Sequence, residues 1–359
     1  MSTHFHPLTI KDIRKETSEC ISISFDIPEE LADTFRFIPG QNLTLRRVID
    51  GEELRRSYSI CSLTNDEVRV AVKLVPKGRF STFLNTSVKA GDTLEALPPA
   101  GRFYTPLDET QQKNYIAFAA GSGITPIIAI ISATLALEKS SRFTLVYGNR
   151  NRNSIIFKEQ LESLKNRYPD RLALHHVLSR EVLESPVNNG RIDAAKCREM
   201  NGRLFDITQF DTFFLCGPEE MIFSVRDWLT EAGIDPLKIH FELFAAPGQA
   251  AGPRQTETDS FTTHPGMRAA VTLKADGIQH AFELDFDGIS ILDAALKQGV
   301  DLPFACKGGV CATCKARLLE GEVKMDTNYA LEPDELQAGF ILTCQSHPRS
   351  QTIVVDFDH

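Results

Sequence analysis

Residues 305–314 read ACKGGVCATC, which places Cys306, Cys311 and Cys314 at the spacing C-x4-C-x2-C. A fourth cysteine, Cys344, follows after the intervening residues 315–343. Four thiolates in this arrangement hold a plant-type 2Fe-2S cluster. The two glycines of the stretch let the backbone curl closely around such a cluster, so that amides can point at sulfur. We therefore predict an iron–sulfur centre whose metal ligands are Cys306, Cys311, Cys314 and Cys344.

Two other uses of these cysteines compete with the cluster. A zinc site usually has two matched arms, but Cys344 has no cysteine or histidine partner at such a spacing, and His347 comes nearest. A disulfide needs an oxidising compartment, whereas the opening MSTHFHPLTI lacks the basic and apolar regions of a signal peptide, so we expect a cytoplasmic protein. The remaining cysteines are scattered among apolar residues and are expected to be mostly buried thiols: Cys20, Cys61, Cys197 and Cys216.

Length and charge restrict the class of protein. A chain of 359 residues exceeds what one hydrophobic core organises, and we expect three domains. The formal charge of −9 argues against a nucleic-acid or anionic-membrane partner. Residues 114–137 carry no charge over a length that could cross a bilayer, but Gly121, Gly123 and Pro126 divide them into a strand, a turn and a helix. We therefore expect no membrane segment.

The pattern of apolar residues divides the chain into four parts. Residues 1–108 contain alternating strand-like runs and predict an antiparallel β-barrel. Residues 112–242 alternate apolar strands with helical stretches, which predicts an α/β domain with a parallel sheet. Residues 246–266 are rich in Gly, Pro, Ser and Thr and are typical of a flexible linker. Residues 268–359 contain strands, one helix and the cysteine stretch. In the α/β part, strands are predicted at 115–120, 143–147, 172–177 and 212–216, and helices at 126–137, 154–167 and 218–232.

A candidate flavin site lies in the first part of the chain. Arg56-Ser57-Tyr58-Ser59 continues into a strand-like run, although alternating Arg, Ser and Tyr could also be the half-exposed face of a barrel strand. Downstream, a helix predicted at 82–88 is entered through Gly78, and a helix N-terminus offers free amides to a phosphate. An arginine together with such an N-terminus suits the pyrophosphate of a flavin dinucleotide.

A candidate nucleotide site lies in the α/β part. The run 121–126, GSGITP, joins a predicted strand to a predicted helix, and this edge of an open α/β sheet binds nucleotide pyrophosphates, unless the run is only a structural turn. Cys216-Gly217 ends a later strand at the same edge, where Cys216 could instead be an ordinary buried thiol. Arginine favours a nucleotide 2′-phosphate. Loop arginines after two further strands therefore favour NADPH, unless they are merely solvated: Arg150, Arg152 and Arg180.

In this order the motifs resemble the ferredoxin-NADP⁺ reductase superfamily, in which an RxYS barrel binds flavin, a GxGxTP/CGP domain binds the nicotinamide nucleotide, and a plant-type ferredoxin is fused behind. The resemblance covers essentially the whole chain. Within the superfamily the chain is similar to the reductase subunits of phenylacetyl-CoA epoxygenases (1,2-epoxidases) of aerobic phenylacetate degradation. The stretches that carry this similarity are 51–61, 119–126, 301–315 and 327–336. The resemblance implies FAD as the flavin and a β-grasp fold for the ferredoxin domain.

The resemblance also implies roles for flavin-site residues. Arg56 would meet the FAD pyrophosphate and Tyr58 would pack against the flavin, with Ser57 beside it in the same motif. Ser59 would lie near flavin N5, one of two positions at which the chemistry is expected. The phosphate site would be completed at the start of the following helix by Gly78, Ser81 and Thr82.

At the nucleotide site the resemblance implies a cradle for the NADPH pyrophosphate made by Gly121, Gly123 and Thr125. Cys216, the second position at which the chemistry is expected, and Gly217 would border the nicotinamide. The 2′-phosphate pair of the superfamily corresponds to Ser179 and Arg180, with Arg150 nearby. The lysine and tyrosine that the superfamily adds there have no counterpart that we can place.

These parts together imply an electron-transfer enzyme. Electrons would pass from NADPH through FAD and the 2Fe-2S cluster to the oxygenase component of a multicomponent monooxygenase, because a flavin can accept a two-electron hydride and release single electrons. The chain could instead serve a ring-hydroxylating dioxygenase or an alkane monooxygenase, or be a redox-sensing module without turnover. An acidic docking patch could be formed by Glu332, Asp334 and Glu335, or these residues could be an ordinary solvated loop.

Overall fold

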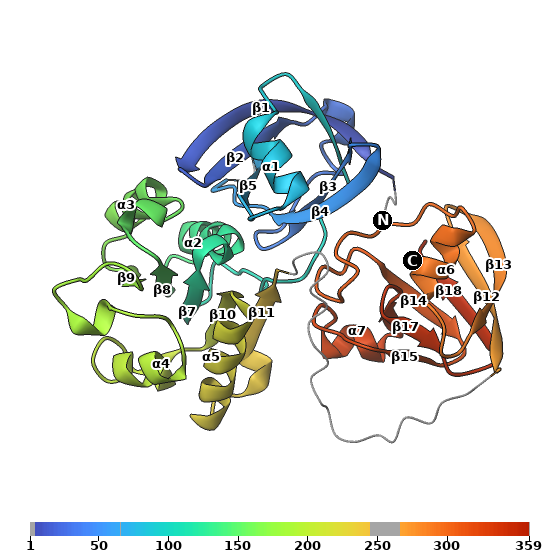
Figure 1. The fold of residues 1–359 in the computed structure, drawn as a ribbon. Helices are drawn as coiled ribbons and strands as arrows, with labels where there is room; N and C mark the ends of the chain where they lie inside the picture. Colours follow the sequence, from blue (N-terminus) through green and yellow to red (C-terminus); the bar gives the residue numbers. More distant parts are fainter. Residues whose placement is uncertain (1–3, 65, 245–265, 359) are drawn as a thin grey trace.

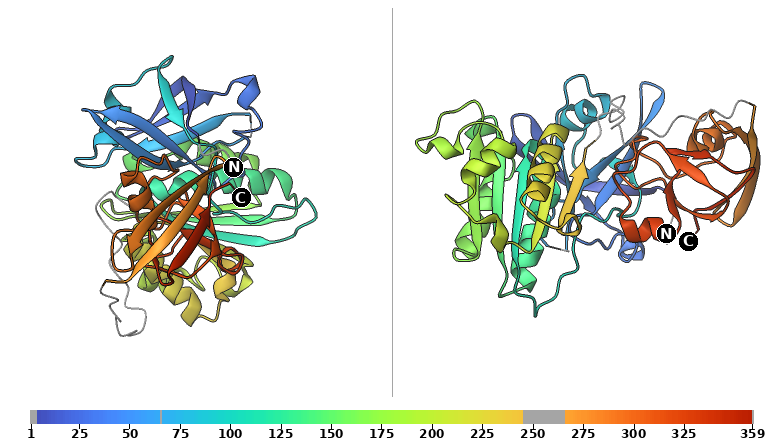
Figure 2. Two further views of the ribbon diagram at one scale, coloured as in Figure 1. Left: turned by 90° about the vertical axis from the view of Figure 1, so that its right-hand side faces the viewer. Right: turned by 90° about the horizontal axis from the view of Figure 1, so that it is seen from below.

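The computed structural model describes residues 4–64, 66–244 and 266–358. They form three bodies: an N-terminal domain up to about residue 108, a middle domain up to residue 244 and a C-terminal domain from residue 266. The N-terminal domain lies against both of the others (Figures 1 and 2). The multidomain architecture predicted from the sequence is confirmed. Apart from Gly266, the predicted linker 246–266 lies outside the described residues.

The N-terminal domain is an antiparallel sheet of six strands in the order β4-β3-β6-β1-β2-β5. A bridge between Ile60 and Val70 joins the end of β4 to β5, so the sheet closes into the predicted barrel. Its inward-facing residues form an apolar core that includes Leu8, Ile23 and Phe80. The elements are β1 (His6–Thr17), β2 (Cys20–Asp26), a 3-10 turn (Glu29–Leu31), β3 (Asn42–Ile49), β4 (Glu52–Ser59), β5 (Val68–Lys73), α1 (Arg79–Thr86) and β6 (Thr93–Ala96).

Helix α1 begins three residues earlier than predicted. The Ser81 hydroxyl accepts a hydrogen bond from the Val75 amide at 3.1 Å and donates one to the Gly78 carbonyl at 3.1 Å. These contacts close the turn at once, and Gly78 becomes the residue that precedes the helix. The prediction of a helix over 82–88 was wrong in its start, because it ignored a serine that satisfies the backbone of its own turn.

The middle domain is a parallel sheet of five strands in the order β11-β10-β7-β8-β9. Helices α2 and α3 pack on the face that meets the barrel, and α4 and α5 cover the opposite face (Figure 1). The elements are β7 (Asn114–Ala120), a 3-10 turn (Gly121–Gly123), α2 (Ile124–Leu137), β8 (Arg142–Asn149), a 3-10 turn (Arg152–Ser154), α3 (Lys158–Arg167), β9 (Leu172–Leu178), a 3-10 turn (Pro186–Asn188), α4 (Ala194–Met200), a 3-10 turn (Ile207–Gln209), β10 (Thr212–Gly217), α5 (Glu219–Glu231), a 3-10 turn (Pro236–Lys238) and β11 (Ile239–Leu243).

Two features of the middle domain differ from the sequence prediction. The helix expected over 154–167 begins only at Lys158, because Phe157 has the left-handed backbone angle φ 61° and Asn151 caps a separate 3-10 turn. Strand β11 and helix α4 were not predicted. The uncharged segment 114–137 forms β7, a turn and α2, and α2 has 14 residues. Within the described ranges, no helix is long and apolar enough to span a bilayer.

The C-terminal domain has a sheet of five strands in the order β13-β12-β18-β14-β16 and a small sheet of β15 and β17. Strands β12 and β18 are parallel, and the other pairs in the larger sheet are antiparallel. One apolar core holds this sheet to α6. The elements are β12 (Arg268–Ala275), β13 (Ile278–Asp285), α6 (Ile291–Lys297), β14 (Lys315–Glu320), β15 (Val323–Met325), α7 (Pro333–Gln337), β16 (Phe340–Leu342), β17 (Ser346–Pro348) and β18 (Thr352–Asp356).

Candidate electron-transfer site

The cluster loop, residues 305–314, lies between α6 and β14. Lys307, Gly309 and Ala312 have left-handed backbone angles of φ 51°, 73° and 54°, which turn the loop around its own cysteines. The Gly308 amide donates a hydrogen bond to Cys306 Sγ at 3.3 Å. The loop thus presents backbone amides to sulfur, as an iron–sulfur site requires.

The four predicted metal ligands come together in two pairs. The Cys306 and Cys311 thiols interact with each other most strongly, as do the Cys314 and Cys344 thiols. All eight cysteines are free thiols. In the part of the chain that the structure describes, no three side chains of His, Cys, Asp or Glu meet at one point as a mononuclear metal site would need. Two pairs fit a dinuclear cluster better than a single zinc ion, because each iron takes two protein ligands.

A cavity of about 420 Å³, the junction cavity, lies where the three domains meet. Its wall combines β4 residues of the predicted flavin motif with the end of β11 and with Cys306 and Cys311 of the cluster loop. Asn42 on β3 also lines it, and the buried Asn42 Oδ1 has no hydrogen-bond partner. A buried acceptor without a donor is costly, and a ligand N–H or a bound water in the cavity would relieve that cost. The cavity therefore suits a polar ring system placed beside the cluster.

Arg56 lines the junction cavity and is available to an anion. Within the described residues it makes no ion pair, and its Nη1 donates only to the neighbouring Arg55 carbonyl at 2.6 Å. Burial lowers the pKa of Arg56, although the guanidinium stays charged. A half-buried cation without a counterion is a suitable partner for a pyrophosphate. Its assignment to the FAD phosphates remains a prediction that this geometry favours.

Ser59 is hydrogen-bonded to Glu242, a residue that the sequence analysis missed. Its Oγ donates a hydrogen bond to Glu242 Oε2 at 2.9 Å, and both residues line the junction cavity. Burial raises the pKa of Glu242 to about 7. The pair can therefore hold a proton at neutral pH and exchange it across the serine hydroxyl. The only signal in the sequence was a carboxylate within the apolar run 239–243, on a strand that was not predicted.

Cys216 lies next to this pair but lines neither large cavity. It is fully buried at the end of β10, in register with Glu242 on β11, and its thiol belongs to the core under α2. Burial raises the pKa of the Cys216 thiol well above its usual range. The structure thus brings Ser59, Cys216 and Glu242 together, with Cys216 behind the cavity wall.

Of the other predicted flavin residues, only Ser57 lines the junction cavity. Its hydroxyl lies 2.9 Å from that of Thr44. Tyr58 points the other way and packs against Phe80, with ring centroids 6.2 Å apart. The start of α1 stands beside the hairpin that joins β3 and β4, because Arg79 bonds Glu52 and the Ile49 carbonyl. The remaining three lie in this helix start and line neither large cavity: Gly78, Ser81 and Thr82.

A second cavity of about 740 Å³, the edge cavity, lies at the carboxyl edge of the parallel sheet. The order β11-β10-β7-β8-β9 makes β7 and β10 neighbours, so the chain reverses its winding direction between them, and such switch points bind ligands. Gly121 and Gly217 line the cavity there. A Cβ on Gly123 would lie 2.0 Å from the Cys216 carbonyl oxygen, so only glycine allows the two turns to meet.

The charged side chains around the edge cavity are mainly cationic. Arg150, Ser179 and Arg180 line it, and the Thr125 hydroxyl donates a hydrogen bond to the Ser122 carbonyl at 3.0 Å. Arg152 does not line it and instead pairs with Glu181 at 3.0 Å. Two cations were missed by the sequence analysis, because one comes from the barrel and the other from an unpredicted loop: Lys73 and Arg191.

The two cavities meet at one aromatic residue. Phe244, which directly follows β11, lines both the junction cavity and the edge cavity. Glu242 lies two residues before it on the junction side. A ligand in the edge cavity and a ligand in the junction cavity would therefore approach each other at this residue.

Comparison with known protein families supports three cofactor-binding modules. Residues 7–105 match an oxidoreductase FAD-binding domain, residues 118–227 an oxidoreductase NAD-binding domain, and residues 273–349 a 2Fe-2S iron-sulfur cluster binding domain. Each match falls inside one of the three bodies described above. The chain is thus an oxidoreductase with modules for FAD, a nicotinamide nucleotide and a 2Fe-2S cluster.

Curated relatives match over nearly the full length of the chain. The chain is 46% identical to a subunit of the 1,2-phenylacetyl-CoA epoxidase of Escherichia coli, over 99% of this chain and 98% of the relative. It is 32% identical to the ferredoxin reductase component of 3-ketosteroid-9-alpha-monooxygenase of Rhodococcus rhodochrous, over 98% and 96%. Phthalate dioxygenase reductase, a solved structure, aligns with a TM-score of 0.57 at 26% identity and 98% coverage of both chains. The chain therefore belongs to the ferredoxin-NADP⁺ reductase superfamily, in the family whose members carry FAD-binding, NAD-binding and 2Fe-2S domains in one polypeptide.

Proposed function

We propose that this chain is an NADPH-dependent reductase that passes electrons through FAD and a 2Fe-2S cluster to an oxygenase of the 1,2-phenylacetyl-CoA epoxidase type. One observation carries the electron path: Cys306 and Cys311 form part of the same cavity wall as Arg56, Ser57 and Ser59. When bound, FAD supplies the chemistry that converts a two-electron hydride donor into single electrons for a cluster.

The residues of the junction cavity would hold and orient the flavin. Arg56 would bind its phosphates, and Asn42 Oδ1 would accept a hydrogen bond from the ring system or from a bound water. Ser59 and Glu242 would keep a proton within reach of the cavity, because burial keeps the Glu242 carboxyl close to half protonated at neutral pH. No described side chain needs to act as a nucleophile.

The charges around the edge cavity support the proposed preference for NADPH. Arg180 and Arg191 line the cavity and make no ion pair with other described residues, and Lys73 and Arg150 add two further cations. A free ribose hydroxyl would favour an acidic partner, whereas a 2′-phosphate favours arginine. Asp193 and Glu220 also line the cavity, so the cations outnumber the acids. Ser179 with Arg180 is the pair that we assign to the 2′-phosphate.

The client oxygenase is inferred from the relatives. The chain is 46% identical to the phenylacetyl-CoA epoxidase subunit and 32% identical to the reductase component of the 3-ketosteroid monooxygenase, with nearly complete coverage in both cases. The second relative is the observation that favours an alternative client. To decide, the purified chain is mixed with the oxygenase components of each system. We expect NADPH oxidation coupled to phenylacetyl-CoA and not to a 3-ketosteroid, and the reverse result would overturn the assignment.

An anaerobic visible spectrum, recorded before and after stoichiometric NADPH with NADH in parallel, tests the electron path. We expect overlapping flavin and cluster bands that bleach promptly with NADPH and slowly with NADH. If the flavin bleached while the cluster bands persisted, internal transfer would be excluded. Faster bleaching with NADH would reverse the nucleotide preference, and a colourless protein that contains metal would restore the zinc interpretation.

A further inference from the structure

Two arginines stand directly opposite each other on the barrel. Arg46 on β3 is the cross-strand partner of Arg55 on β4, and their side chains are 18% and 5% exposed. Like charges in directly opposed positions of an antiparallel pair destabilise the sheet. A buried guanidinium cannot lose its charge, so this pair needs counterions.

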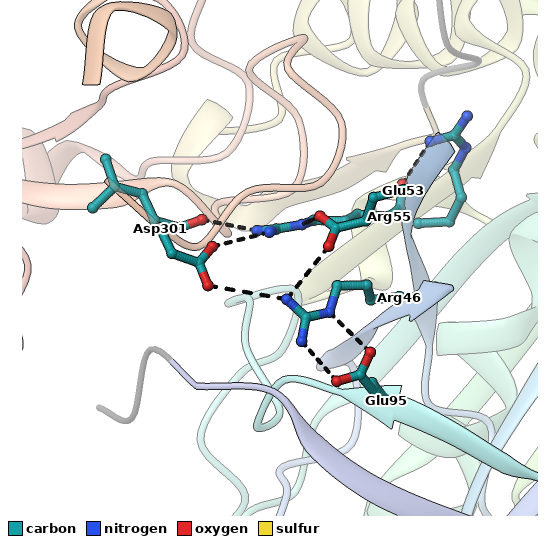
Figure 3. A network of polar contacts seen from close by, with 7 residues as sticks. Arg46, Glu53, Arg55, Glu95 and Asp301 are labelled. Carbon is teal, nitrogen blue, oxygen red and sulfur yellow. Dashed lines mark hydrogen bonds and ion pairs between the residues drawn. The ribbon is translucent and has the colours of Figure 1, made fainter. Parts of the chain in front are cut away.

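The counterions come from two domains (Figure 3). Glu53 lies between the arginines, 2.7 Å from Arg55 and 3.6 Å from Arg46, and Glu95 binds Arg46 at 2.7 Å. Asp301 belongs to the C-terminal domain, yet its carboxylate lies 3.0 Å from Arg55 and 4.0 Å from Arg46. One aspartate thus bridges the pair across the domain boundary.

Arg55 also holds the segment that leads to the cluster loop. Its Nη1 donates a hydrogen bond to the Leu302 carbonyl at 2.9 Å, and its guanidinium lies over the Phe304 ring, 4.2 Å from the centroid. Cys306, a predicted cluster ligand on the wall of the junction cavity, follows two residues later. Arginine suits this combination because its flat, always charged group can bind a carboxylate, a carbonyl and an aromatic face together.

We propose that Arg55 and Asp301 form a latch that positions the C-terminal domain for electron transfer from the flavin to the cluster. The inference rests on the proposed electron path. In the step concerned, one electron leaves the reduced flavin and enters the oxidised cluster, with NADPH as the source. Arg55 is a positioning residue in this role, since it acts through the segment 301–304 that it holds.

The Arg55–Asp301 ion pair is accessible to solvent and is therefore weakened by salt. The Asp301 side chain is 72% exposed, so dissolved ions can screen its attraction to Arg55. Other contacts cross the same boundary, including the Thr44 and Thr313 hydroxyls at 3.2 Å and the pair Arg102–Asp334 at 2.9 Å. Loss of the latch should therefore weaken docking without unfolding either domain.

The test compares Asp301→Asn with Asp285→Asn in the holoenzyme. Asp285 is a matched control: it is 68% exposed, pairs with Arg268 at 3.0 Å, and lies in the same domain with a partner in that domain. Anaerobic stopped-flow absorbance follows flavin and cluster bleaching separately after NADPH is added. We expect D301N to leave flavin reduction unchanged and to slow cluster reduction by about two- to fivefold. D285N should match the wild type.

The dependence of the cluster reduction rate on salt concentration distinguishes loss of the Arg55–Asp301 ion pair from a general structural effect of the substitution. Raising ionic strength from about 0.05 to about 0.5 M should slow cluster reduction in the wild type and in D285N, but should have little further effect in D301N. Cluster reduction in D301N at the wild-type rate at every salt concentration would overturn the proposal. If no variant, the wild type included, transferred electrons from flavin to cluster, both the electron path and the latch would fail.

A second measurement does not depend on turnover. Small-angle scattering of the oxidised holoenzyme should give a larger radius of gyration for Asp301→Lys, which places a third cation against Arg46 and Arg55. Asp285→Lys should leave the radius unchanged. Equal radii for D301K and the wild type, together with unchanged cluster reduction, would show that Asp301 does not hold the domains together.

Discussion

The two cavities of this protein are built in different ways. The edge cavity is made at the end of one sheet, where glycine turns after β7 and β10 meet. The junction cavity is made by side chains from three domains, which include Asn42, Glu242 and Cys306. A site made by the backbone of neighbouring strands leaves a motif in the sequence, whereas a site assembled across domain boundaries leaves scattered single residues. The following variants test this contrast.

The largest effect is expected at the edge cavity, from Gly123→Ala. The added Cβ would lie 2.0 Å from the Cys216 carbonyl oxygen and 2.7 Å from the Gly217 amide, so β10 and the turn after β7 must separate. We expect a loss of about 3 kcal/mol or more in stability of the middle domain and a loss of NADPH binding. Thermal unfolding and nucleotide titration measure these effects, and Ser122→Ala, in the same turn, is the control for stability. A G123A protein that unfolds and binds like the wild type would show that backbone contact does not define this cavity.

At the junction cavity the corresponding variant is Glu242→Gln, and its effect depends on pH. The pKa of Glu242 is raised from 4.5 to about 7, so the folded protein binds more protons than the unfolded chain between these values. Wild-type stability therefore falls as pH rises through this window and stays low above it. Glutamine cannot ionise, so the variant's stability does not depend on this titration. E242Q should have the same free energy of unfolding as the wild type near pH 4.5, and one higher by roughly 2 to 3 kcal/mol at pH 8.

Unfolding midpoints of the holoenzyme measured across pH 4.5–8 check this expectation. Glu138→Gln is not a suitable control, because Glu138 accepts buried hydrogen bonds from Tyr115 and Ser141. Glu231→Gln is better, since Glu231 is exposed and pairs with Arg198 at the surface. A constant difference between E242Q and the wild type over this range would contradict the raised pKa.

The contrast between the two cavities also explains which site residues could be predicted from the sequence and which could not. The cysteine spacing and the GSGITP turn depend on contacts between residues close in sequence or in neighbouring strands, and both predictions identified residues that the structure brings together. Glu242 was missed because its strand, β11, is short and lies at the edge of the sheet. Asp301 was missed because nothing near it in sequence indicates that it meets Arg55, 246 residues away.

The acidic loop illustrates the same limit. Glu332, Asp334 and Glu335 were expected to be either an open docking patch or a solvated loop, but they begin helix α7. Asp334 binds Arg102 of the barrel, and the buried Glu335 binds Lys315 at 2.9 Å. The charges of Asp334 and Glu335 are thus engaged within the chain, and Asp334 faces the N-terminal domain.

A medium effect is expected for the cations of the edge cavity. Arg180→Gln removes a donor that we assign to the 2′-phosphate, and Arg191→Gln removes a second arginine that lines the same cavity. A hydrogen bond to a charged group contributes about 1.5–3 kcal/mol. Each variant should raise the KM for NADPH about tenfold and leave the KM for NADH nearly unchanged. Arg152→Gln is the control, because Arg152 pairs with Glu181 outside the cavity. An equal increase in KM for NADPH and for NADH would mean that these arginines bind a group that the two nucleotides share.

The smallest effect is expected for Asp334→Asn, the second ion pair across the boundary that holds the latch. Arg102 is 39% exposed and also lies 3.7 Å from Glu335, so it keeps a carboxylate and access to water when Asp334 is neutral. Arg55 is 5% exposed and loses its only interdomain carboxylate among the described residues when Asp301 is changed. An exposed pair with a substitute partner contributes less than about 0.5 kcal/mol, so D334N should slow cluster reduction by less than about twofold. Stopped-flow rates for D334N equal to those for D301N would show that burial of the arginine does not set the strength of docking, and that the two ion pairs act as one surface.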